Sequence, residues 1–287
     1  MANTRAILLM TAAMAAFAIS DAFINRAAET LPTGQILAIT CALGFIPFLF
    51  RLRKTGERLF SANLWHHAVL VRTIGEVLGS LGYVMALSLV PLATASAMLQ
   101  AQPLAVTMAA AIILGERVGP RRWAAVGLGF VGVLMIIRPG AEAFDPNVLW
   151  ALLGIAGLTA RDLGTRLLPK EISTPFVSFW ALFLLSLLGL AIMPVDGVWR
   201  QIEGLAWFWL IGCSVSVAFA IVAITAALRI GEISAIAPFR YTRMVFALAI
   251  AILLLGESPD AMTWAGTALI VGSGIYAFWR ERTLAQS

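Results

Sequence analysis

The sequence predicts an all-α membrane protein with ten transmembrane helices, arranged as two inverted repeats of five helices each. Three observations lead to this fold class. Of the 287 residues, 61% are hydrophobic and 12% are charged, which is about half the charged fraction of soluble domains. Apolar runs long enough to cross a bilayer follow one another along the whole chain. The chain also aligns with itself at a constant offset.

The predicted spans are separated by prolines, glycines or charged residues, and their lengths suit a hydrocarbon core of roughly 30 Å. Most of the nine tryptophans lie near a predicted helix end, as expected for rings at the headgroup level, and only Trp180 lies well inside a span. The spans are 6–24, 33–50, 65–89, 93–114, 122–137, 148–168, 174–193, 205–228, 234–255 and 261–279.

Positive charge indicates the orientation of the chain. The net charge of +5 reflects the excess of Lys and Arg in cytoplasmic loops, and not a nucleic-acid partner. If the N-terminus is cytoplasmic, the outer loops hold only Arg26, Arg138 and Arg200 of the 20 Lys and Arg residues. We therefore expect a multi-pass protein of the bacterial inner membrane, with lipid around it and both termini in the cytoplasm.

An internal repeat divides the chain into residues 1–141 and 142–287. A shift of 141 positions places Gly115-Glu116 on Gly256-Glu257, and it also places Asp21 on Asp162. Five helices per repeat is an odd number, so the second repeat must enter the membrane from the opposite side. The loop after Gly115 is basic and the loop after Gly256 is acidic, which agrees with opposite sidedness.

Ionisable side chains inside a membrane are costly and should face the interior of the bundle. In the third span, Arg72, Glu76, Gly79 and Tyr83 share one helix face, so Arg72 and Glu76 can pair. That pair is either a self-neutralising structural contact or part of a gate. Glycines 75, 79 and 82 predict the close approach of a neighbouring helix.

The fourth span carries a polar stripe of Ser96, Gln100, Pro103 and Thr107, which is the best candidate for the lining of a cavity. The proline removes a backbone donor near the middle of the span. In the repeat-related ninth span, Tyr241 takes the place of Gln100 and lies between Arg240 and Arg243.

The two arginines leave alternatives open. Their guanidinium groups could bind a substrate carboxylate, or they could pair with Asp21, Asp162 or Glu76. Neighbouring helix residues point about 100° apart, so we expect Asp162 to pair with Arg240 or Arg243 and not with the adjacent Arg161.

The candidate residues fall into two groups. The substrate-binding candidates are Tyr83, Gln100, Arg240, Tyr241 and Arg243, and the gating or ion-pair candidates are Asp21, Arg72, Glu76 and Asp162. The carboxylates are scattered, and Cys41 and Cys213 lie in apolar runs, so we expect no catalytic residues, metal site or cofactor. An intramembrane enzyme is a remote alternative.

Two segments resemble the EamA module of the drug/metabolite transporter superfamily. They are Pro103…Leu114-Gly-Glu-Arg…Trp123…Gly127…Gly132 and Leu255-Gly-Glu…Trp264…Gly272. The resemblance implies a secondary transporter with alternating access through a central cavity, in which the Gly-Glu segments are structural turns. The chain is most similar to bacterial exporters of aromatic and neutral amino acids. S-adenosylmethionine, riboflavin or a cationic drug are the alternative substrates.

Overall fold

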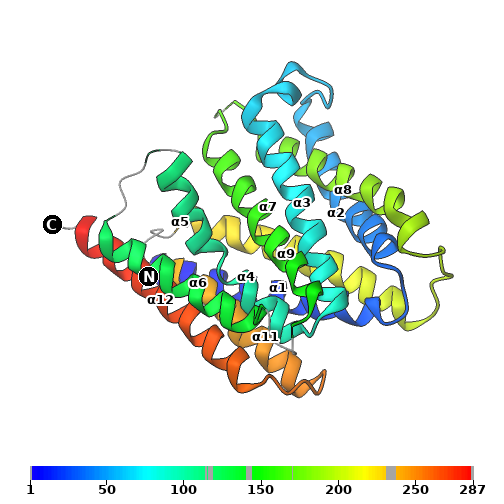
Figure 1. The fold of residues 1–287 in the computed structure, drawn as a ribbon. Coiled ribbons are helices and arrows are strands. Elements are labelled where there is room, and N and C mark those ends of the chain that lie inside the picture. Colours follow the sequence, from blue (N-terminus) through cyan, green and yellow to red (C-terminus); the bar gives the residue numbers. More distant parts are fainter. Residues whose placement is uncertain are drawn as a thin grey trace. The chain divides into compact units, whose positions relative to one another are not determined.

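The computed structural model describes residues 2–285 apart from 114, 116–118, 140–143, 170 and 231–236. The described residues form helices and turns with no β-strand among them, which confirms the all-α prediction (Figure 1). The α-helices are α1 (Ala2–Ala28), α2 (Thr33–Thr55), α3 (His67–Leu89), α4 (Leu92–Leu99), α5 (Gln102–Ile113), α6 (Pro120–Ile137), α7 (Leu149–Arg166), α8 (Thr174–Asp196), α9 (Leu205–Ile230), α11 (Thr242–Leu253) and α12 (Ala261–Ala285). The 3₁₀ turns are η1 (Ala62–Trp65), η2 (Pro146–Val148) and η3 (Ala237–Tyr241).

Within the described part of the chain, 7 helices are long and apolar enough to cross a membrane. They are Thr4–Ala28, Thr33–Thr55, His67–Leu89, Leu92–Ile113, Pro146–Thr165, Thr174–Pro194 and Leu205–Ile224. A shorter apolar helix, Trp123–Ile137, lies at the predicted fifth span. The predicted ninth span begins in residues 234–236, which lie outside the described residues. Ten spans therefore stay a prediction.

The helices recur along the chain at the offset found in the sequence. Helices α2 and α8 each have 23 residues, and both their first and last residues are 141 positions apart. Helices α3 and α9 end at Leu89 and Ile230, and α6 and α12 begin at Pro120 and Ala261, again 141 positions apart. The predicted boundary between residues 141 and 142 lies outside the described residues.

The chain forms two compact units, and each takes helices from both repeats. The first unit consists of Met1–Ala22, Leu89–Leu149 and Ser216–Ser287, and the second consists of Phe23–Ser88 and Trp150–Val215. In the first unit α6 packs along α12, and in the second unit α2 packs along α8 (Figure 1). Each of these helices therefore lies beside its own repeat equivalent.

Glycines allow α3 and α7 to approach until their backbones touch in the second unit. A methyl group added at Gly79 would lie 2.6 Å from the backbone nitrogen of Leu158. One added at Gly157 would lie 2.3 Å from the backbone nitrogen of Gly79. Gly75 and Gly82 show similar contacts with α7, which confirms that these glycines admit a neighbouring helix.

In the first unit, the contact between α1 and α9 is equivalent to the one between α7 and α3, and alanines take the place of glycines there. Ala13 of α1 packs in one buried cluster with Ala223 and Ala227 of α9. Ala13 and Ala223 occupy the repeat positions of Gly154 and Gly82, so the same contact is made with a methyl group on each side. Small residues allow close packing in both places.

The segment that joins α11 to α12 caps helix α4. The Glu257 carboxylate accepts hydrogen bonds from the backbone N–H groups of Leu92 at 2.7 Å and Ala93 at 2.9 Å. Pro91 precedes these residues and provides no side-chain cap, so Glu257 satisfies donors that the start of a helix leaves unpaired. The Gly256-Glu257 motif is thus a structural turn at helix ends, as the resemblance to the EamA module implied.

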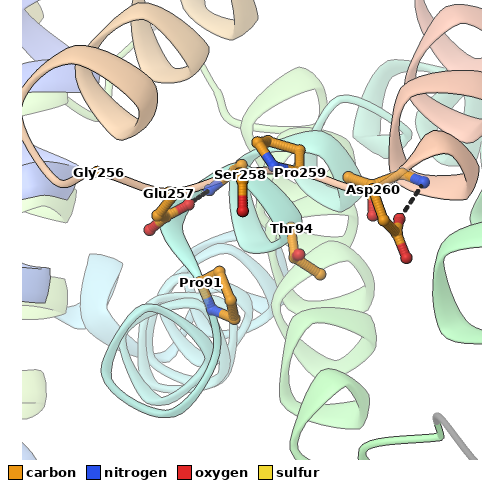
Figure 2. Close-up of a pocket in the computed structure, with 9 residues that line it drawn as sticks. Pro91, Thr94, Gly256, Glu257, Ser258, Pro259 and Asp260 are labelled. Carbon is orange, nitrogen blue, oxygen red and sulfur yellow. Dashed lines mark hydrogen bonds between the residues drawn. The ribbon is translucent and has the colours of Figure 1, made fainter.

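Asp260 at the other end of this segment caps α12 by accepting a hydrogen bond from the Thr263 N–H at 2.8 Å (Figure 2). Its carboxylate also pairs with the Arg138 guanidinium, which follows the last residue of α6. The hydrogen bond from Arg138, together with the one from Thr263, lowers the pKa of Asp260 to about 2. The segment is therefore tied to α4, α6 and α12 at neutral pH.

The backbone contact between α3 and α7 predicts that Gly79→Ala destabilises the protein. The added methyl group must push the helices apart, at a cost of about 1–3 kcal/mol. Gly127→Ala is the matched control, since nothing lies within 4 Å of its added methyl group. Thermal unfolding of the purified protein in detergent should show a lower Tm for Gly79→Ala only. Equal Tm values for the two variants would contradict the close approach of α3 and α7.

The cap on α4 predicts a local effect of Glu257→Ala. Loss of the carboxylate leaves two backbone donors without their acceptor, which costs about 1 kcal/mol. Hydrogen–deuterium exchange should become faster at the Leu92 and Ala93 amides. Glu257→Gln, which keeps one acceptor oxygen, should lie between wild type and Glu257→Ala. Unchanged exchange at these two amides in Glu257→Ala would show that the cap has no energetic role.

Candidate functional site

The predicted fourth span is broken near its middle. Helix α4 ends at Leu99 and α5 begins at Gln102, with Gln100 and Ala101 in a turn between them. The N–H groups of Gln100 and Ala101 bond to carbonyls three residues earlier, as in a 3₁₀ turn. Pro103 has no N–H for the regular helical bond to the Leu99 carbonyl, which explains why the helix breaks here.

The repeat-related ninth span changes from a 3₁₀ turn to an α-helix at the position equivalent to Gln100. The 3₁₀ turn η3 ends at Tyr241, and the regular helix α11 begins at Thr242. Tyr241 lies 141 residues after Gln100, so the two breaks correspond in the two repeats. Discontinuous helices at equivalent positions are where many secondary transporters hold substrate.

Gln100 and Tyr241 are in direct contact. The Gln100 Nε2 group donates a hydrogen bond to the Tyr241 carbonyl oxygen at 3.2 Å, and each residue is 7% exposed. Equivalent residues of two repeats meet only near the axis that relates the repeats. This hydrogen bond therefore indicates that a pseudo-two-fold axis passes beside both helix breaks.

One polar group near the break is left unsatisfied. Ser96 lies one turn before Gln100 on the predicted polar stripe and is 3% exposed. Its buried hydroxyl has no hydrogen-bond partner among the described residues. The last member of the stripe, Thr107, is satisfied because its hydroxyl donates to the Pro103 carbonyl at 3.0 Å. A buried hydroxyl without a protein partner can hydrogen-bond a water or a ligand.

The first turn of α11 carries a buried ion pair. Arg243 Nη2 lies 2.7 Å from both carboxylate oxygens of Asp21, and Arg243 Nε lies 3.1 Å from one of them. Asp21 is 2% exposed, and the Phe17 ring lies 5.1 Å below the guanidinium carbon. Of the alternatives left open for Arg243, the structure shows the pair with Asp21. Arg240 in η3 is exposed.

An apolar cluster in the first unit is linked to this charged pair through Phe17. Met10 and Met14 belong to the buried cluster between α1 and α9, and Phe17 and Phe239 pack against the same cluster. Phe17 also contacts Arg243. The first unit thus places the Arg243 guanidinium beside an aromatic ring that packs against this apolar cluster.

A second group of charges lies in the second unit. Glu76 lies 3.7 Å from Arg72 on its own helix and 3.3 Å from Arg161 of α7. The Arg72 guanidinium also donates to the Val177 carbonyl of α8 at 3.2 Å. The predicted pair of Arg72 and Glu76 is confirmed. Together with Asp162, two arginines and two carboxylates form a group without net charge.

The prediction that Asp162 would not pair with Arg161 is wrong. Arg161 Nε and Nη2 lie 2.9 and 2.8 Å from the same oxygen of Asp162. The Cβ atoms do point apart, but the long arginine side chain folds back far enough to reach its neighbour. Sequence reasoning left Arg161 out of the candidates, although an arginine inside a span beside an aspartate was a sufficient signal.

Tyr83 belongs to a different unit from the other substrate-binding candidates. It is buried in α3, and a methyl group at Gly154 would lie 3.1 Å from its backbone nitrogen. Gln100, Arg240, Tyr241 and Arg243 all belong to the first unit. A shared site that includes Tyr83 stays a prediction, as do the substrate-binding and gating roles of the whole set.

A pocket of about 430 Å³ lies at the helix ends of the first unit (Figure 2). Its two carboxylates, Glu257 and Asp260, already cap α4 and α12. None of the predicted substrate-binding residues lines it, so we assign this hollow to the structural turn. The lining residues are Pro91, Ala93, Thr94, Gly256, Glu257, Ser258, Pro259, Asp260 and Thr263.

The chain is similar in sequence to proteins that are named as transporters or exporters. The chain is 29% identical to a riboflavin transporter of Rhizobium johnstonii over 244 residues, which are 82% of this chain and 76% of the relative. It is 27% identical to the pseudopaline exporter CntI of Pseudomonas aeruginosa over 266 residues, covering 92% and 93%. It is 24% identical to an S-adenosylmethionine uptake transporter of Rickettsia prowazekii over 204 residues, covering 71% and 69%.

The fold and the family are shown by two further matches. A crystal structure of another protein superposes on 97% of this chain and 98% of its own with a TM-score of 0.64, at 20% identity, which shows the fold alone. The model of the EamA-like transporter family matches residues 4–138 and again residues 146–279. The chain therefore belongs to the EamA-like transporter family, and it is a multi-pass membrane transporter of small molecules and not an enzyme.

Proposed function

We propose that this protein is a secondary transporter of the bacterial inner membrane that exports a small metabolite with a carboxylate and an apolar group. Neutral and aromatic amino acids are the proposed substrates. The observation that carries this proposal is the placement of Arg243 at a helix break beside the Phe17 ring, which packs against an apolar cluster that contains Met10 and Met14. A guanidinium binds a carboxylate in a fork, while apolar and aromatic side chains accommodate an apolar substituent.

The two arginines, Arg240 and Arg243, have different proposed roles. Arg243 pairs with Asp21, and Arg240 lies at an exposed position in η3, one residue before Tyr241. An arginine within a span costs at least about 2.5 kcal/mol on insertion scales, and such residues are usually kept for function. Arg240 is therefore the candidate for the first contact with a substrate carboxylate, and Gln100 and Tyr241 supply polar groups at the break.

For the topology, we propose ten spans in two inverted repeats, residues 1–141 and 142–287, with both termini in the cytoplasm. The recurrence of helix bounds at an offset of 141 residues supports the duplication. The family model also matches the chain twice, over 4–138 and 146–279. Alternating access follows as the mechanism, because inverted repeats provide two similar states that open to opposite sides.

A second candidate substrate class comes from the relatives. Proteins named as transporters of riboflavin and S-adenosylmethionine align with 82% and 71% of this chain. Riboflavin has no carboxylate, so its transport would not need an arginine fork. S-adenosylmethionine carries both an amino-acid carboxylate and an aromatic base, which would suit the same site as an aromatic amino acid.

The proposed function is tested by counterflow into liposomes that contain the purified protein. Radiolabelled phenylalanine, methionine and threonine are compared with riboflavin and S-adenosylmethionine. Saturable uptake of the amino acids is the expected result. Uptake of riboflavin alone would overturn the carboxylate proposal and leave the transporter family intact.

We predict that Arg240→Gln weakens transport of carboxylate substrates and leaves the protein folded, because the side chain is exposed. Loss of a charge-assisted contact of about 1.5–3 kcal/mol corresponds to roughly a 10- to 100-fold rise in KM. Arg51→Gln removes one exposed arginine at the end of α2 and is the matched control. A wild-type KM in Arg240→Gln, or poor folding of that variant alone, would speak against this role.

A further inference from the structure

The ion pair between Asp21 and Arg243 has the geometry of a bound substrate carboxylate. Both oxygens of Asp21 lie 2.7 Å from Arg243 Nη2, and Nε adds a contact at 3.1 Å. We propose that Asp21 is an internal competitor that occupies the Arg243 guanidinium when substrate is absent and yields it to a substrate carboxylate during transport. This inference rests on the proposed function and deepens it.

The location of the pair allows a substrate carboxylate to replace Asp21 at the Arg243 guanidinium. Arg243 lies in the first turn of α11, two residues after Tyr241, whose carbonyl accepts the Gln100 hydrogen bond. Asp21 lies inside the continuous helix α1. Arg243 is the second residue of α11 and closely follows the 3₁₀ turn η3, and such a change of helix type often marks a hinge. The arginine can therefore turn towards a substrate while the aspartate stays in place.

The second repeat shows that the fold does not require this pair. The repeat equivalent of Asp21 is Asp162, which pairs with the neighbouring Arg161 on its own helix. The repeat equivalent of Arg243 is Gln102. A membrane aspartate can thus be neutralised from within its helix, and a partner on a separate, broken helix is an additional feature of the first unit.

Competition by Asp21 also avoids leaving the Arg243 guanidinium unpaired when substrate is released. A guanidinium left unpaired in a site of low dielectric constant is strongly unfavourable. If Asp21 replaces the departing carboxylate, Arg243 has a partner in both states. The competitor lowers the apparent affinity by the fraction of time that the guanidinium is occupied, which makes release easier.

The inference is tested with pairs of probes that differ mainly at the carboxylate. The pairs are L-phenylalanine with L-phenylalaninamide, and S-adenosylmethionine with its decarboxylated form. Binding to purified protein and exchange in liposomes are measured for wild type and Asp21→Asn. We expect Asp21→Asn to bind the carboxylate probe about tenfold more tightly and to exchange it more slowly. Binding of the probe without a carboxylate should not change.

The charge-balanced double variant Asp21→Asn with Arg243→Gln separates competition from a structural role. It should fold, bind weakly and no longer prefer the carboxylate probe, even if Asp21→Asn alone does not fold. A double variant that keeps the preference would overturn the inference, and so would unchanged or weaker carboxylate binding in folded Asp21→Asn. Wild-type protein that binds no carboxylate probe would instead overturn the proposed function, and the inference with it.

Discussion

The structure depends on one constraint, which is that backbone polar groups inside a membrane must be satisfied by the protein itself. A helix satisfies this requirement until it breaks, and each break then needs a local partner. The break at Gln100 and the change of geometry at Tyr241 meet it together, because the Gln100 side chain supplies a donor for the Tyr241 carbonyl. One of the two equivalent segments thus supplies a hydrogen bond that the other needs at its break.

Close helix packing provides the rigid surroundings of the charged groups. The glycines of α3 and α7 bring two backbones into contact, and the four charges of Arg72, Glu76, Arg161 and Asp162 lie along the same two helices. In the first unit the corresponding contact uses alanines, and the charged pair involves a third helix, α11. The two repeats thus share their packing and differ in how they place charge.

The sequence allowed the helical fold, the repeat offset and the small-residue contacts to be predicted, because each depends on periodicity or residue size. The partners of the arginines were harder to predict. Helical spacing assigns Arg243 to a face but does not say which helix lies opposite, so Asp21, Asp162 and Glu76 all remained possible. The reach of the Arg161 side chain to Asp162 was missed because Cβ directions ignore three flexible methylene groups. The missing N–H of Pro103 was predicted to disturb backbone bonding near mid-span, and the structure places the end of α4 and the start of α5 within the single span Leu92–Ile113.

The contact between Gln100 and Tyr241 has a consequence for how such a protein can be encoded. Two separate copies of one five-helix chain would carry the same residue at each of the related positions, so an arginine at the place of Arg243 would also stand at the place of Gln102. Joining the halves in one gene removes this restriction, so the chain can hold Arg243 at one of the two related positions and the uncharged Gln102 at the other.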